Sequence, residues 1–202
     1  MSSEDAWLRY GGRICLDFVN TLRDRQRTPR ETLLVPSDLR RWLEWAGLSV
    51  PARPASEDAE ALALARGLRD AVDRAVLAAA GGSLPAPADL SLLNRTAAAL
   101  PPPAPQLDVV GGKLVMSMAA APAPADLAAS LAPVAQDAVT LLPSPDVLRV
   151  RVCGADGCAL RFVDRSPAHN RRWCSMERCG NRVKARRHQA RTGRSPRRDG
   201  GG

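Results

Sequence analysis

The sequence is poor in aromatic residues and in histidine. Phenylalanine, tryptophan and tyrosine make up 3% of its 202 residues, and the only histidines are His169 and His188. Because hydrophobic residues still make up 45%, a core must form mainly from leucine, valine and alanine, with the four tryptophans as large anchors. The shortage of histidine excludes a histidine-based triad, and no phosphate-binding glycine loop or nucleophile elbow is present. We therefore expect a protein that is not an enzyme.

Long apolar runs are also missing. No stretch approaches the roughly 18 apolar residues of a membrane span. Residues 1–9 carry two acidic groups and lack the basic and apolar pattern of a signal peptide. We expect a chain that makes no membrane contact, is not exported and resides in the cytoplasm.

Acidic residues are scarce in one part of the chain only. Residues 149–199 contain 15 lysines and arginines but 4 acidic residues, which is a net charge of +11. Residues 1–148 contain 14 basic and 17 acidic residues, which is a net charge of −3. A near-neutral body is thus followed by a strongly cationic segment, which is typical of proteins that bind nucleic acid.

The body, residues 1–143, is expected to be mostly helical with one β-hairpin. Apolar residues recur at helical spacing, and Ser37 and Ser56 stand where each could cap the free amides of a helix. On either side of Gly111–Gly112 the apolar residues alternate with a period of about two, as in β-strands, and the two glycines suit a tight hairpin turn. The expected helices cover residues 13–28, 37–46, 56–80, 87–100 and 123–142, the last kinked or split at Pro133, and the expected strands cover 106–110 and 113–118. Pro143 to Pro145 are the expected boundary with the basic part.

Two polar side chains and a cysteine lie in the first apolar run of the body. Asp17 and Asn20 could support acid–base chemistry, but capping or a satisfied hydrogen bond in the core is the simpler interpretation. Cys15 in the same run is interpreted as a small buried hydrophobic residue.

The other four cysteines lie in the basic segment, in two close pairs. Four residues separate Cys153 from Cys158 and Cys174 from Cys179, and fifteen residues lie between the pairs. Such spacing lets each pair form one edge of a tetrahedral metal site. Four thiolates favour one zinc ion and leave no open coordination position, so the ion would be structural. An iron–sulfur cluster and disulfides are the alternatives, but the missing export signal and the odd fifth cysteine favour a reducing compartment.

The residues around these cysteines indicate a small finger over residues 147–191. Residues 148–152 and 160–164 alternate like two short strands that would pair with each other. Ser175 can cap a helix that runs to Arg191. A knuckle, a hairpin and a helix that starts at the second cysteine pair give a treble-clef-like layout, so the whole chain is expected to have an α+β fold.

The expected basic helix has little apolar surface with which to dock. Cys179, Val183 and Ala190 share one narrow stripe at helical spacing, and basic residues surround it. Metal ligation must therefore anchor the helix, and the finger should unfold without the ion.

Two stretches of the sequence resemble known families. Residues 171–176 (RRWCSM) and 179–184 (CGNRVK) are similar to the CGNR zinc finger, which is named for the residues at 179–182, and the upstream cysteine pair and residues 162–164 fit the same motif. Residues 17–22 (DFVNTL), followed by LxxWL at 39–43, resemble the ABATE domain that usually precedes this finger. The resemblance implies a bacterial protein described as a stress-induced transcription regulator, with zinc held by the four cysteines.

The expected helix and the residues before it carry the side chains of a nucleic-acid interface. Lysine and arginine contact phosphates, and asparagine can read base edges. The candidate contacts are Arg171, Arg172, Arg178, Asn181, Arg182, Lys184, Arg186, Arg187 and Arg191. Alternatively, Arg171, Arg172 and Arg182 neutralise the sulfurs, because a zinc ion with four thiolates has a net charge of about −2. Trp173 is interpreted as part of a miniature core, and residues 192–202 as a disordered basic tail.

These observations predict a DNA-binding transcription regulator. The finger would hold the nucleic acid, and the body would sense a small-molecule effector or mediate association, for example as a homodimer. Two alternatives stay open: an interaction module that grips RNA or an acidic protein, and a thiolate redox sensor that releases zinc under oxidant.

Overall fold

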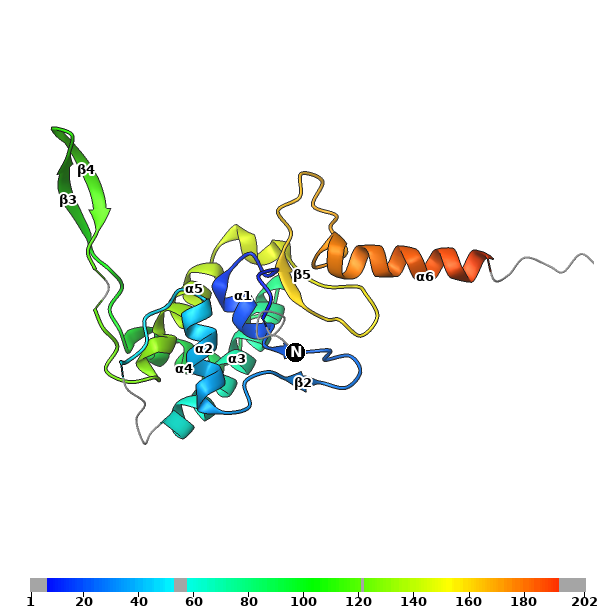
Figure 1. Ribbon diagram of the computed structural model, residues 1–202, viewed down its shortest axis with the longest axis horizontal. Helices are drawn as coiled ribbons and strands as arrows, with labels where there is room; N and C mark the ends of the chain where they lie inside the picture. Colours follow the sequence, from blue (N-terminus) through cyan, green and yellow to red (C-terminus); the bar gives the residue numbers. More distant parts are fainter. Residues whose placement is uncertain (1–6, 53–57, 121, 193–202) are drawn as a thin grey trace, which may run out of the picture.

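The computed structural model describes residues 7–52, 58–120 and 122–192, without the side chains of residues 187, 188 and 190–192. Among these residues the chain forms six α-helices and three separate two-stranded antiparallel sheets, joined by short 3-10 turns (Figure 1). The α+β class expected from the sequence is confirmed. No helix in the described ranges has both the length and the apolar character that a membrane crossing requires.

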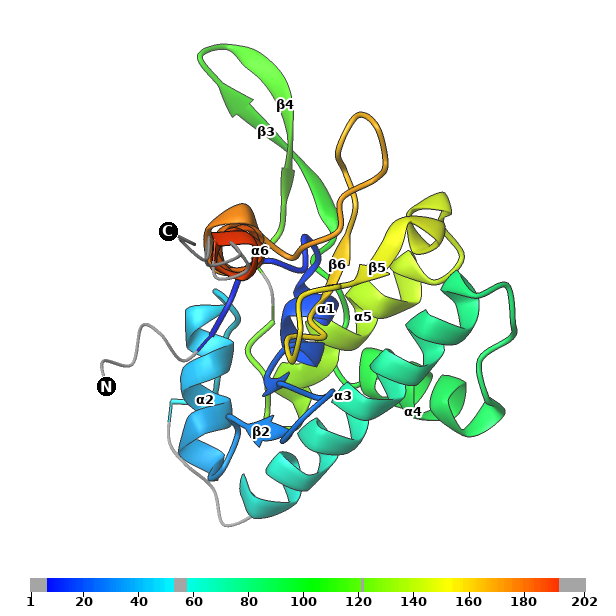
Figure 2. The same ribbon diagram turned by 90° about the vertical axis from the view of Figure 1, so that its right-hand side faces the viewer.

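The body is a bundle of helices around the short helix α1 (Ile14–Val19). The long helix α3 (Asp58–Ala80) and the helix α5 (Ala132–Leu141) both contact α1, while α4 (Pro87–Ala98) packs on α3 and α5 (Figure 2). Helix α3 buries Leu62, Leu68 and Val72 at helical spacing, which explains why this stretch folds as a helix and which face it turns inward. Leucine, valine and alanine make up most of the core, as the composition predicts.

The scarce aromatic residues anchor the contact between α1 and α2 (Pro36–Trp45). Phe18 and Trp42 are fully buried, and their ring centroids lie 4.8 Å apart. Trp45 continues the cluster, 6.4 Å from Trp42 and 6.0 Å from Trp7. Tilted pairs at these distances are favourable beyond the area that they bury.

The first expected helix is shorter than predicted. It ends at Val19, and the chain then forms the small hairpin β1 (Leu22–Arg23) and β2 (Arg30–Glu31). The Thr21 hydroxyl donates to the Phe18 carbonyl, and Asp24 adopts a left-handed backbone conformation with φ of 52°. Both features turn the chain away from the helix axis.

The expected cap at Ser37 is also wrong. Helix α2 begins one residue earlier, at Pro36, where proline is favoured because the first helical amide needs no acceptor. The Asp38 carboxylate accepts hydrogen bonds from the amides of Leu34 and Val35, at 2.9 and 3.0 Å. The second expected cap, Ser56, lies outside the described residues.

The remaining body elements follow the sequence closely. Strands β3 (Pro105–Val110) and β4 (Lys113–Met118) pair across Gly111–Gly112, as expected. The stretch expected as a helix over 123–142, kinked or split at Pro133, is interrupted near that residue: a 3-10 turn covers Ala129–Leu131, and α5 begins at Ala132 with Pro133 in its first turn. Residues 122–128 are not helical, so the expected helix is wrong over 123–128.

The basic part begins with a 3-10 turn over Pro145–Arg149. Strands β5 (Val150–Val152) and β6 (Arg161–Val163) pair antiparallel, which confirms the expected finger hairpin at a shorter length. A π-helical turn over Met176–Gly180 leads into α6 (Asn181–Thr192), which points away from the body (Figure 1).

Candidate metal centre

The first cysteine pair lies on a tight turn at the end of the finger hairpin. Cys153 directly follows β5, and its amide donates to the carbonyl of Leu160 at 2.8 Å. The Cys158 amide donates to the carbonyl of Ala155 at 3.0 Å, which closes the turn. Gly157 and Ala159 have φ of 78° and 54°, and this left-handed backbone lets the chain reverse within so few residues. The turn aims both sulfurs to one side.

The second pair is placed by a cap and a π-helical turn. The Ser175 hydroxyl accepts a hydrogen bond from the Arg178 amide at 2.9 Å, which confirms the cap expected there. Cys174 stands just before this cap, and Cys179 lies within the turn that follows it. The Gly154 amide donates to the carbonyl of Arg172 at 2.9 Å and ties the two pairs together through the backbone.

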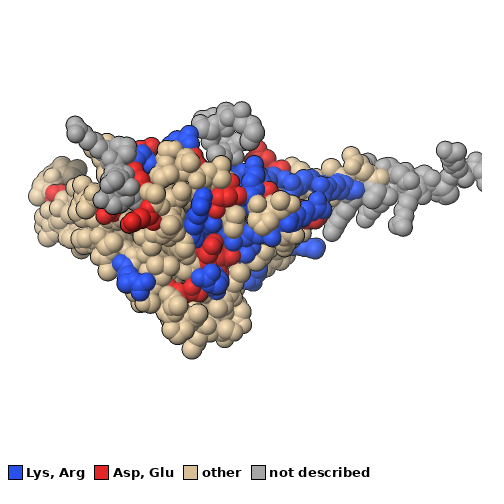
Figure 3. All heavy atoms as spheres, turned by 90° about the horizontal axis from the view of Figure 1, so that it is seen from below, with Lys and Arg blue, Asp and Glu red and all other residues tan. Residues whose placement is uncertain are grey.

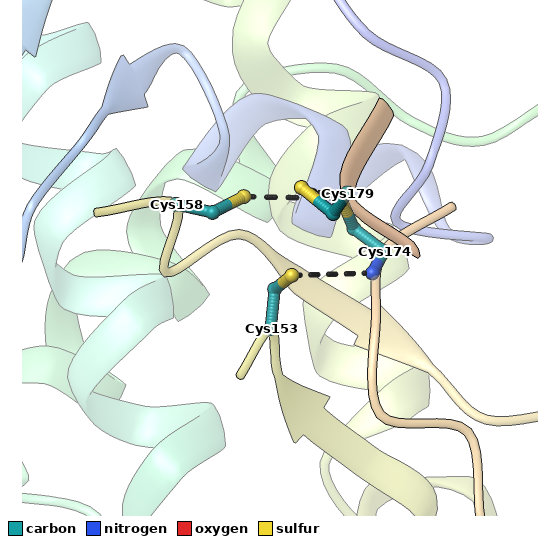
Figure 4. Close-up of side chains that lie close together, drawn as sticks. All are labelled: Cys153, Cys158, Cys174 and Cys179. Atoms are coloured by element: carbon teal, nitrogen blue, oxygen red, sulfur yellow. Dashed lines mark hydrogen bonds between the residues drawn. The ribbon is translucent and has the colours of Figure 1, made fainter. Parts of the chain in front are cut away.

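The four sulfurs meet at one buried point (Figure 4). All of them lie within 4.8 Å of one another, and each cysteine is at most 2% exposed. The sulfur of Cys174 is 3.8 Å from that of Cys158 and 3.6 Å from that of Cys179. A zinc ion with bonds of about 2.3 Å to four sulfurs would give a tetrahedral edge of about 3.8 Å. The donor set and its dimensions therefore fit zinc, and these separations exclude sulfur–sulfur bonds.

Hydrogen bonds favour a negative charge on the sulfur of Cys153. The Cys174 amide donates to the sulfur of Cys153 at 3.3 Å, and the Arg182 guanidinium lies 3.6 Å from the sulfur of Cys179. The pKa of the Cys153 thiol lies well below its ordinary value, because its sulfur accepts hydrogen bonds from the Cys158 and Cys174 thiols and from the Cys174 amide. The pKa of the Cys174 thiol is raised by its hydrogen bonds to Cys153 and Cys158, and burial raises the pKa of the Cys179 thiol. Thiolate is the form that binds metal, and four thiolates leave no open coordination position, so the role of the ion would be to hold the chain in place.

The arginines before the second pair stabilise the finger in a different way. Arg171 stacks on the ring of Phe162, with 4.5 Å from the guanidinium carbon to the ring centroid, and it donates to the carbonyls of Trp173 and Cys174. Arg172 is exposed and lies 5.8 Å from the Trp173 ring centroid. Neither has a recorded contact with a cysteine sulfur within the described ranges. Trp173 is half-buried against the cysteine cluster, as expected for a miniature core.

The candidate nucleic-acid contacts on α6 differ in their exposure and partners. Asn181, Arg182 and Lys184 are exposed, and no ion pair involves Lys184 among the side chains that the structure describes. Arg186 pairs with Asp156 at 3.4 Å. Arg178 is half-buried in the π-helical turn. The side chains of the last two candidates, Arg187 and Arg191, lie outside the described residues, as does the tail beyond Thr192.

A buried polar contact joins the finger to the body. The side chain of Asn20 donates to the carbonyl of Arg161 at 2.9 Å and accepts from its amide at 2.8 Å. The Arg161 guanidinium makes two hydrogen bonds to the Asp73 carboxylate on α3, at 2.8 and 3.1 Å. Val150 and Val163 belong to the hydrophobic core of the body. The finger hairpin is therefore part of the body's packing, although 141 residues separate Asn20 from Arg161.

The polar residues of the first run thus have structural roles. Asn20 is 4% exposed and makes two hydrogen bonds to the finger backbone, which confirms the interpretation as a satisfied core hydrogen bond. Asp17 accepts from the Gly11 amide at 2.8 Å, and burial raises its pKa to about 6. Cys15 is fully buried, as expected. Burial, and to a lesser extent the charge of the nearby Asp137, raises the pKa of its thiol.

Sequence reasoning missed two residues that shape the centre. Asp164 is fully buried, and its carboxylate accepts from the amides of Ser166 and Arg171, both at 2.9 Å, so it fixes the loop that leads to Cys174. Asp73 is the partner of Arg161 and lies on a helix that the sequence assigns to the body. A carboxylate next to a strand end was a visible signal for Asp164, but nothing in the sequence relates Asp73 to the finger.

Comparison with known families agrees with this architecture. A model of the ABATE family, described as "Putative stress-induced transcription regulator", matches residues 12–145. A model of the CGNR zinc finger matches residues 149–192. No curated protein matches the chain. The finger match and the four-sulfur cluster together support one structural zinc ion. The chain therefore belongs to the ABATE family, and its family domain is followed by a CGNR zinc finger.

Proposed function

We propose that the protein is a cytoplasmic, DNA-binding transcription regulator that is not an enzyme. In this proposal Cys153, Cys158, Cys174 and Cys179 bind the zinc ion, and the ordered finger presents α6 to the phosphate backbone. The observation that carries the proposal is the position of the charge. Basic side chains gather at the end of the molecule from which α6 projects (Figure 3), while the body before it has a net charge of −3.

The shape of α6 supports contact with a polyanion. Asn181, Arg182 and Lys184 are exposed on the first turn of the helix, and α6 points away from the body (Figure 1). Arg182 also lies 3.6 Å from the sulfur of Cys179, so it links the metal site to the outer surface. A phosphate at this turn would meet cations whose positions depend on the metal. Arg171, Arg172, Arg178, Arg186, Arg187 and Arg191 are the further proposed contacts.

Fluorescence anisotropy with a mixed-sequence DNA duplex at low salt tests this function. If about six phosphates are contacted, the logarithm of the association constant should fall with that of the salt concentration with a slope of roughly −5. Lys184→Ala should weaken binding and reduce the slope by roughly one. Arg95→Ala is the matched control, because Arg95 is an exposed arginine on α4, away from α6 (Figure 1). Equal effects of the two substitutions, or no binding to DNA at low salt, would contradict the proposal.

The alternatives predict different partners. Tighter binding to structured RNA than to DNA would favour an RNA-binding module. Retention of one acidic protein after nuclease treatment, without DNA binding, would favour a protein partner. A redox sensor is favoured less, since the sulfurs are at most 2% exposed and oxidants reach buried thiolates slowly.

We propose that the body also binds a small uncharged ligand. A cavity of about 490 Å³ lies between α3, α4, α5 and the turn that precedes the finger, and apolar side chains dominate its lining, including Leu90, Leu93, Val139 and Leu142. Its volume is in the range of small-molecule sites, and Asn94 and Ser83 offer polar contacts. Val147 lines the cavity three residues before β5 begins, so a ligand there could act on the finger.

The fluorescence of the apolar dye N-phenyl-1-naphthylamine tests this ligand site. Val139→Trp should fill the cavity and reduce dye binding. Leu77→Trp is the control, because Leu77 is equally exposed, at 36% against 37% for Val139, and does not line the cavity. Dye binding that is unchanged by Val139→Trp would refute the site.

A further inference from the structure

The hairpin β3–β4 projects from the body as an isolated arm (Figures 1 and 2). Every residue from Pro105 to Met118 is exposed except Ser117, which is half-buried. A two-stranded hairpin is marginally stable in water unless a helix, a further strand or a partner covers one face. In the described part of the chain nothing covers this one.

The strand register sorts the arm into two unlike faces. Neighbouring residues along a strand point to opposite sides, and directly paired residues share a side. One face carries Leu107 paired with Met116, Val109 paired with Leu114, and Pro105 paired with Met118. The other face carries Gln106 paired with Ser117, Asp108 with Val115, and Val110 with Lys113. The first face, here called the apolar arm face, contains no polar or charged side chain.

The apolar arm face is large for a surface in contact with water. Leu107, Leu114 and Met116 are 73%, 73% and 75% exposed, and Val109 and Met118 are 69% and 56% exposed. Together these five residues, backbone included, present on the order of 650 Å² of accessible surface, at the upper end of the apolar patches found on monomers. One partner in a standard interface contributes about 800 Å², so the arm with its flanking residues offers what a stable dimer needs.

We propose that the apolar arm face is the homodimer interface of this protein, in which the faces of two copies pack against each other across a twofold axis. Three features of the face favour a second copy as its partner. It is uncharged, so an acidic or basic partner would lose hydration without gaining an ion pair. It is open rather than a pocket, and flat apolar sheet faces pack well on each other. It also supplies its own complement, because in a twofold interface the same patch serves both sides.

Such a dimer would place the two basic helices far apart. The arm and α6 lie at opposite ends of the molecule along its longest axis (Figure 1). Joining two arms therefore leaves both fingers at the outer ends, free to bind at the same time. Dimerisation needs no nucleic acid, so it is tested separately from the proposed function.

Light scattering coupled to size exclusion, on the full zinc-loaded chain, tests the interface over a dilution series from sub-millimolar to micromolar. The wild type should elute at about twice the chain mass of 21.6 kDa at high concentration. Leu107→Lys with Met116→Lys, a directly paired couple on the apolar arm face, should elute as a monomer at every concentration. Gln106→Lys with Ser117→Lys is the matched control, because it adds the same charge to a paired couple on the other face and should remain a dimer.

Hydrogen exchange identifies the surface involved. Amides over residues 105–118 should become more protected as the wild type is concentrated, and those of the apolar-face variant should not. A wild type that is monomeric at every concentration overturns the proposal. Amides of the arm that are then always protected would indicate that the body covers it. Amides that are always exposed would indicate that a different protein covers it. A dimer that survives Leu107→Lys with Met116→Lys overturns it too. Zinc content and circular dichroism verify that each variant is folded.

Discussion

The buried pair of Asp73 and Arg161 should make a large contribution to stability, because it lies where the finger meets the body. Asp73 is 9% exposed and Arg161 is 8% exposed, and two hydrogen bonds join them. Arg25 lies 3.3 Å from the same carboxylate. Asp73→Ala would therefore leave two guanidinium groups close together, one of them buried, without a countercharge. Breaking a buried pair from one side costs about 3–5 kcal/mol.

The expected loss is in the lower part of that range. Alanine is a better helix former than aspartate by about 0.5 kcal/mol, which offsets some of the cost on α3. Arg161 also keeps a hydrogen bond to the carbonyl of Ala159. We expect Asp73→Ala to lower the free energy of unfolding by about 3 kcal/mol, a large fraction of the roughly 5–15 kcal/mol typical of a domain.

Urea unfolding of the zinc-loaded chain, followed by circular dichroism, measures this loss. Asp156→Ala is the control, because Asp156 also pairs with two arginines, Arg27 and Arg186, but its side chain is 55% exposed. Exposed pairs contribute at most about 1 kcal/mol, so the control should change little. Combining Asp73→Ala with Arg161→Met removes the stranded charge and should restore part of the stability. Equal losses of unfolding free energy for the two alanine variants, or a double variant less stable than Asp73→Ala, would refute the reasoning.

Three further outcomes are expected. Chelation of zinc should speed amide exchange over residues 174–192 but leave 150–152 and 161–163 protected, because Val150 and Val163 lie in the body core; uniform unfolding would contradict this. Folding raises the pKa of Asp17 from 3.8 to about 6, so the folded state binds the proton more tightly than the unfolded state. The free energy of unfolding should therefore fall as the pH rises from about 4 to 6, by at most about 1.4 kcal/mol per pH unit. Asp17→Asn should remove this slope when the two proteins are unfolded side by side over that pH range. Mild peroxide should leave zinc bound, as read with a metal indicator, because the sulfurs are buried; rapid stoichiometric release would support a redox sensor instead.

Features set by nearby residues could be predicted from the sequence. The cysteine spacing indicated the cluster, Gly111–Gly112 indicated the hairpin, and Ser175 indicated its cap, since each depends on a few neighbouring residues. The failures at the first helix and at Ser37 also have local causes. The Thr21 hydroxyl donates to the Phe18 carbonyl where the helix ends, and the Asp38 carboxylate binds the amides of Leu34 and Val35 just before the start of α2.

Contacts between distant segments could not be predicted. Arg161 is counted in the basic segment, and charge alone would assign it to nucleic acid, yet it is buried against Asp73. A satisfied core hydrogen bond was one of the interpretations of Asn20, but nothing in the sequence indicates that its partner is the backbone of the finger. Sequence patterns also show that the hairpin has an apolar face, but whether the body covers that face depends on tertiary packing.

Two kinds of contact hold the finger in place, packing on the body and metal ligation, and they connect the metal to function in different ways. Strands β5 and β6 are held by the body core and by the Asn20 and Asp73 contacts, so their order does not require zinc. The segment from Cys174 through α6 has a smaller apolar contact. In the described residues Cys174 and Cys179 belong to a small buried cluster, against which the half-buried Val183 and Leu8 and Tyr10 of the body pack, and the rest of the helix points away from the body. Three exposed cations, Arg182, Lys184 and Arg186, lie on this second segment. Loss of the ion should therefore remove the ordered cationic surface while the rest of the molecule stays folded, which makes zinc occupancy a control on binding rather than on folding.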